Sequence, residues 1–133
     1  MGLFSKPKYV GYNFQVNSYQ DALKFQDFVV RDANSEYSLD LHNPFRYQSD
    51  GYIKVIYGCN SRKKDQVIVY VTDLTVLIAF EETLLSDEKI MAVADKVIQE
   101  FADAGKSVQF ESSTKAIDDF KMYQYMKATA GLY

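Results

Sequence analysis

The sequence predicts an α+β fold: a single two-layer domain in which a mixed, mostly antiparallel sheet of five or six strands carries about three helices. Three observations predict it. Alternating apolar residues mark several short strands, apolar residues three and four positions apart mark the helices, and the elements follow the order β-α-β-β-β-β-α-β-α. A length of 133 residues is usual for one domain. We therefore expect residues 1–133 to form one domain, with a flexible segment over residues 1–8.

The first strand is predicted over residues 9–16, where apolar residues alternate with polar or small ones, as in a strand with one buried face. Asn17 or Ser18 offers an N-cap for the first helix. That helix is predicted over residues 19–33, whose apolar residues recur at helical spacing. A second strand is predicted over residues 36–42, where alternation returns.

The middle of the chain is predicted as a loop, a strand and a hairpin loop. Residues 43–50 are interpreted as a loop because they contain Pro44 and run into Gly51. A strand is predicted over residues 52–59, and the polar residues 60–65 are interpreted as a hairpin loop.

The next strand is the most apolar one. Residues 66–72 are apolar on both faces, which is typical of a central strand covered on both sides. Asp73 and Leu74 are predicted to turn the chain into another strand over residues 75–81. A single irregular strand over residues 66–81 is the alternative.

The strongest helical pattern covers residues 87–104. Ser86 stands at its N-cap, acidic residues fill its first turn and Gly105 stands just beyond its end. A short strand over residues 106–111 and a final helix over residues 114–129 complete the order. The two β-α-β passages are expected to place parallel neighbours in the sheet.

Composition disfavours several classes of function. A net charge of −3 is unlike the strong basic excess of general nucleic-acid binders. One cysteine and no long apolar stretch over residues 1–8 predict a soluble, cytoplasmic protein without a membrane segment. The glycines form no dinucleotide or phosphate-binding motif, and one Cys with one His cannot build a structural zinc site. We therefore expect no cofactor and no metal.

The candidate catalytic residues are few. Cys59 and His42 would be a nucleophile and its base, but the predicted hairpin places them at opposite ends of their strands, on the order of 20 Å apart. Asp40 and His42 share one face of a predicted strand, about 7 Å apart along it. We assign no catalytic residue, and a small hydrolase using Asp40 and His42 remains an alternative function.

Two predicted loops carry candidate binding residues. The first is an aromatic–basic–aromatic trio that could stack on a ring or anchor a protein partner, formed by Phe45, Arg46 and Tyr47. The second is a basic tip that could contact an anionic partner, formed by Arg62, Lys63 and Lys64. The alternatives are that the rings close the core under their loop and that the charges keep the tip soluble.

The aromatic content bears on function. The chain has 11 Tyr and 9 Phe but no Trp. Tyr is enriched at protein interfaces, although it also covers half-buried sheets. With the aromatic trio and no catalytic signature, this favours a non-catalytic protein–protein interaction module: an adaptor, an inhibitor or immunity-like protein, or a subunit of a homo-oligomer. A nucleic-acid accessory protein using Arg46, Tyr47 and the basic tip is a further alternative.

Overall fold

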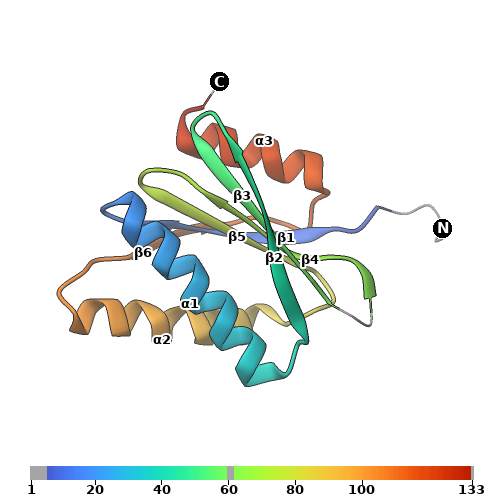
Figure 1. The fold of residues 1–133 in the computed structure, drawn as a ribbon, viewed down its shortest axis with the longest axis horizontal. Helices are drawn as coiled ribbons and strands as arrows, with labels where there is room; N and C mark the ends of the chain where they lie inside the picture. Colours follow the sequence, from blue (N-terminus) through green and yellow to red (C-terminus); the bar gives the residue numbers. More distant parts are fainter. Residues whose placement is uncertain (1–5, 60–61, 133) are drawn as a thin grey trace.

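The structure is a computed structural model that describes residues 6–59 and 62–132, apart from the side chains of residues 43 and 62–64. Its elements are β1 (Tyr9–Gln15), α1 (Tyr19–Tyr37), β2 (Leu41–Ser49), β3 (Tyr52–Cys59), β4 (Arg62–Val71), β5 (Thr75–Glu81), α2 (Asp87–Asp103), β6 (Gln109–Ser113) and α3 (Asp119–Ala130) (Figure 1). This order confirms the predicted α+β class and succession of elements. Residues 1–5 of the expected flexible segment lie outside the described residues, while the Lys8 carbonyl accepts a hydrogen bond from the Glu82 amide.

The strands form one six-stranded sheet in the order β2-β3-β4-β5-β1-β6. Every neighbouring pair in that order is antiparallel. The two β-α-β passages therefore create no parallel neighbours in this sheet, contrary to our expectation. β5 and β6 lie on either side of β1, and three strands separate β1 from β2. This leaves β2 and β6 as the two edges.

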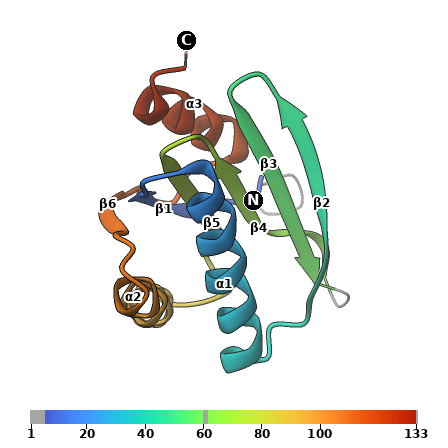
Figure 2. The ribbon, with the colours of Figure 1, turned by 60° about the vertical axis from the view of Figure 1, so that its left-hand side comes forward.

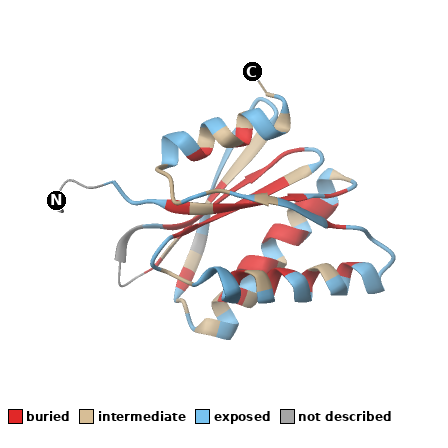
Figure 3. Ribbon diagram, turned by 180° about the vertical axis from the view of Figure 1, so that it is seen from behind, coloured by how far each residue is buried: buried red, intermediate tan, exposed pale blue. Residues whose placement is uncertain are grey.

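Helices cover both faces of the sheet, which adds a third layer to the two that we expected. α1 and α2 pack on one face (Figure 1), where the Phe25 ring contacts the rings of Phe14 and Phe101, with centroids 4.9 and 5.7 Å away. α3 packs on the other face through Met122 and Met126. Buried residues follow the central strands and the sides of α1 and α2 that meet them (Figure 3).

β1 is buried on both faces, not on one as its alternation predicted. Its second face lies under α3, and a Cβ added to Gly11 would stand 2.6 Å from the Met122 sulfur. Asn13 on the same face is 5% exposed. Both positions look solvent-facing in the sequence but are covered in the fold, and Gly11 makes room for α3.

α1 continues beyond its predicted end, and the strand predicted over residues 36–42 begins only at Leu41. Tyr37 stands one helical turn after Ala33, so it belongs to the last turn of the helix rather than to an alternating strand. Ser38 and Asp40 then adopt left-handed backbone conformations, with φ of 50° and 61°, and turn the chain into β2.

The predicted loop of residues 43–50 is mostly strand. β2 runs through it to Ser49, because Pro44 occupies an edge strand at a point where the register with β3 shifts, between His42 and Phe45. A proline is tolerated at such a place, where its missing N–H interrupts no regular ladder.

Tight turns join β2 to β3 and β4 to β5. Asp50 and Gly51, whose φ is +86°, close a two-residue hairpin between β2 and β3. β4 begins at Arg62, so most of the loop predicted over residues 60–65 is strand, and residues 60–61 lie outside the described part of the chain. A turn closed by the Thr72 amide on the Thr75 carbonyl separates β4 from β5, which confirms two strands.

The predicted limits of the later elements are nearly correct for α2 and shifted for the last two. Ser86 caps α2 by accepting a hydrogen bond from the Lys89 amide, as its position predicted. β6 begins three residues later than predicted and α3 five residues later, capped by Asp118. Within residues 6–59 and 62–132, we find no helix of the length and apolar character needed to cross a membrane.

Candidate functional site

The two rings predicted as binding residues lie on an exposed face of β2. Phe45 is 62% exposed and Tyr47 is 49% exposed. Their ring centroids are 5.2 Å apart and the rings are inclined by 37°, because side chains two positions apart share one face of a strand. The alternative that these rings tuck inward and close the core is therefore wrong.

Arg46 points away from the two rings. It pairs with Val55, which is completely buried on the face that α1 covers. On that side burial and the nearby Asp27 carboxylate raise the pKa of Tyr57 to about 12, while Arg46 acts in the opposite direction. The predicted trio is thus divided between two faces, with the rings on one and the guanidinium on the other.

Only the backbone of the basic tip belongs to the described structure. The backbone of Arg62, Lys63 and Lys64 belongs to β4, at the end of the sheet opposite to the turn between β2 and β3. Their side chains lie outside the described part of the structure, so their predicted role stays a prediction.

The outer side of β2 is an open strand edge. In an antiparallel pair, alternate residues direct their backbone N–H and C=O groups toward the partner strand and the others direct them away. Ser49 and Tyr52 flank the two-residue turn and are therefore hydrogen-bonded to each other. Because this orientation alternates along the strand, the backbone groups of Tyr47, like those of Ser49, point toward β3. The backbone groups of Arg46 and Gln48 point outward, away from the sheet. No other strand of the six-stranded sheet lies along this side (Figure 2).

The sheet face around the rings is only partly covered. α3 packs on residues of β1, β4 and β5, and its Tyr123 ring reaches Tyr52 at the start of β3. Lys54 lies between the part of this face that α3 covers and the part that carries the two rings. Its Nζ is 3.5 Å from an Asp119 carboxylate oxygen in the first turn of α3 and 5.5 Å from the centre of the Tyr70 ring. Beyond Lys54, the rings of Phe45 and Tyr47 face solvent.

The structure corrects the expected separation of His42 and Cys59. Because β2 begins at Leu41, that residue pairs with Cys59, and His42 pairs with the adjacent Gly58. The two candidate residues therefore stand on neighbouring strands and close together, not about 20 Å apart.

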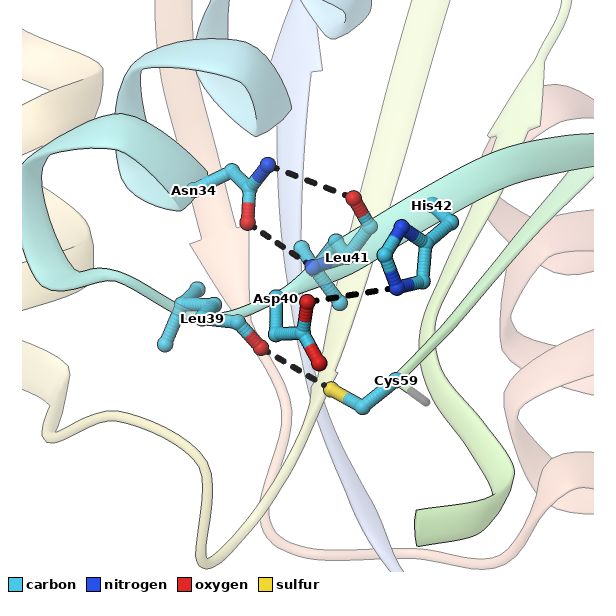
Figure 4. Close-up of polar contacts among 6 residues, drawn as sticks. All are labelled: Asn34, Leu39, Asp40, Leu41, His42 and Cys59. Carbon is cyan, nitrogen blue, oxygen red and sulfur yellow. Dashed lines mark hydrogen bonds and ion pairs between the residues drawn. The ribbon is translucent and has the colours of Figure 1, made fainter. Parts of the chain in front are cut away.

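These residues belong to a polar cluster at the start of β2 (Figure 4). A His42 ring nitrogen, Nε2, lies 3.2 Å from an Asp40 carboxylate oxygen, and the Cys59 thiol donates a hydrogen bond of 3.1 Å to the Leu39 carbonyl. The Asn34 side chain contacts the backbone of Leu41 twice, accepting from its N–H at 2.9 Å and donating to its C=O at 3.3 Å. The cluster thus fastens the start of β2 to the last turns of α1.

The hollow beside His42 is small, and only part of the cluster borders it. Its volume is about 170 Å³, and Asn34, Leu41 and His42 line it, whereas Asp40 and Cys59 do not. A small hydrolase using Asp40 and His42 requires a deep cleft at this point. In the part of the chain that the structure describes, no group of three or more His, Cys, Asp or Glu side chains could hold a metal ion.

Comparison with known proteins adds no assignment. The sequence matches no protein-family model, no curated protein and no solved structure.

Proposed function

We propose that this protein is a protein–protein interaction module that binds an extended segment of its partner along the outer edge of β2. The observation that carries the proposal is the exposed pair Phe45 and Tyr47 on a strand whose outer backbone groups have no strand beside them among the described residues. In strand addition, main-chain hydrogen bonds supply affinity and side chains at alternate positions supply specificity.

The two rings and the backbone are both needed for binding. An aromatic side chain has roughly 150–250 Å² of surface. With Phe45 62% and Tyr47 49% exposed, about 200 Å² is available, worth at most about 5 kcal/mol at 25 cal/mol per Å². Association costs on the order of 4–15 kcal/mol. The rings alone therefore do not hold a partner, and the outward N–H and C=O groups of Arg46 and Gln48 must contribute.

β2 is a better candidate than the opposite edge. β6 has five residues against nine in β2, and its pairing with β1 is irregular. Its exposed ring, Phe110, already packs against Phe14 with centroids 5.6 Å apart. At the other end of β2, Pro44 and the register shift hinder pairing with a further strand, a protection that is common in natural edge strands. The segment from Phe45 to Ser49 lacks that protection.

Photo-crosslinking in the cells that make the protein tests this proposal. Benzoylphenylalanine replaces Tyr47, and the control carries it at Phe110 on the opposite edge. We expect one identified protein to be crosslinked from position 47, and the adduct to disappear with Arg46→Pro, which removes an outward N–H without breaking the pairing with β3. An adduct that forms equally from position 110, or that survives Arg46→Pro, would contradict strand addition at β2.

A further inference from the structure

We infer that the strand that adds to β2 is β2 of a second copy of this chain. The inference rests on the proposed function and specifies its partner. The two strands run antiparallel, related by a two-fold axis through Tyr47, so that the sheets of two copies become continuous.

The segment from Phe45 to Ser49 is complementary to itself in this arrangement. Residues whose backbone groups face outward must pair with each other, and here Arg46 of one copy pairs with Gln48 of the other. Tyr47 then stands opposite Tyr47, and Phe45 stands opposite Ser49. All five residues of each copy find a partner, and no like charges stand directly opposite each other.

The neighbouring registers are less favourable. A shift by two residues in one direction places Arg46 opposite Arg46, and it places Gln48 opposite Pro44, which has no N–H to donate. The opposite shift places Gln48 opposite Gln48 and pairs Arg46 with Asp50, a turn residue outside the strand. That shift also separates the two Tyr47 rings. The two-fold axis is therefore placed at Tyr47.

The paired strands bring four rings together on one face. Phe45 and Tyr47 project to the same side in each copy, and strand pairing keeps that side common to both sheets. From the exposed fractions, the four rings offer roughly 400 Å² for burial. Stable interfaces bury about 1,200–2,000 Å² in total. Self-association is accordingly weak, reversible and dependent on concentration.

Two variants with opposite charges at position 47, on the two-fold axis, test the inference by analytical ultracentrifugation. The wild type is expected to shift from the 15.3 kDa mass of one chain toward twice that value as its concentration rises. Tyr47→Glu or Tyr47→Lys alone places like charges directly opposite each other, and we expect about a tenfold or greater rise in the dissociation constant. An equal mixture of the two variants is expected to restore the dimer, because Glu then faces Lys.

The matched controls are Phe110→Glu and Phe110→Lys, which are expected to leave dimerisation unchanged. Arg46→Pro is a second, backbone-based variant and is expected to remain monomeric. A wild type that stays monomeric at every concentration, or Tyr47 variants that do not recover on mixing, would overturn the inference. If the wild type is monomeric but position 47 still crosslinks another protein in a manner sensitive to Arg46→Pro, the proposed function stands and only the second copy is excluded. If both experiments fail, both proposals fail.

Discussion

Replacing Asn34 with alanine should loosen the start of β2. The substitution removes a hydrogen bond of 2.9 Å to the Leu41 N–H and one of 3.3 Å to its C=O. Leu41 is only 7% exposed, so water replaces these contacts poorly. Each bond contributes about 0.5–1.5 kcal/mol net, which gives a loss of about 2 kcal/mol from the free energy of unfolding. For a chain of 133 residues this corresponds to a fall in Tm of roughly 6–10 °C.

Urea unfolding followed by circular dichroism measures the effect. Ser35→Ala, at an exposed neighbouring position of α1, is the matched control and is expected to change stability by less than about 0.5 kcal/mol. If Asn34→Ala costs no more than Ser35→Ala, the Asn34 side chain does not fasten β2 to α1, and the role given to the polar cluster is wrong.

Three further predictions concern other parts of the fold. Gly11→Ala should lower the free energy of unfolding by about 1–3 kcal/mol, because its Cβ would stand 2.6 Å from the Met122 sulfur. Denaturant unfolding should show a smaller loss when Met122 is also replaced by alanine. An equal loss in both backgrounds would refute the contact. Tyr57, with its pKa raised to about 12, should contribute stability that is complete below pH 10 and falls by roughly 1 kcal/mol per pH unit between about pH 10 and 12. The Tm of Tyr57→Phe should therefore depend less on pH in that range than the Tm of the wild type. Identical pH dependence of the two proteins would disprove the effect. Ser38→Gly should raise the free energy of unfolding by roughly 0.5–1 kcal/mol, because Ser38 has a φ of 50°; a lower Tm would contradict this.

The fold class could be predicted from the sequence because most elements carry their own periodic signal. Ser18 and Ser86 begin α1 and α2 as N-caps, and the fully apolar run in β4 proved to be a central strand. These features depend on residues close together in the chain. Local rules are therefore sufficient to place them.

The errors arise where distant contacts decide the outcome. Gly11 appears to face solvent until α3, about a hundred residues later, covers it. Pro44 indicates a loop by itself, yet its place on an edge strand makes it acceptable. The dipeptide Asp50-Gly51 was the available signal for the hairpin, since Asp-Gly is typical of two-residue turns.

The candidate site was predictable only in part. Phe45 and Tyr47 could be predicted as binding residues because aromatic side chains that follow a proline in a predicted loop are candidate contact residues. The open backbone edge could not be selected, because it depends on the order of strands in the sheet. The proximity of His42 to Cys59 was missed for a related reason: a difference of a few residues in where β2 begins changes every pairing with β3.

Hydrogen exchange of individual amides in β2, followed by NMR at low and high protein concentration, addresses strand addition most directly. The Tyr47 amide bonds to β3 and should be protected at both concentrations. The Arg46 and Gln48 amides should exchange rapidly in the dilute sample and become markedly slower in the concentrated one, as they bond to the second copy. Rapid exchange at Arg46 and Gln48 in both samples, or a Tyr47 amide as unprotected as theirs, would contradict the pairing proposed for β2.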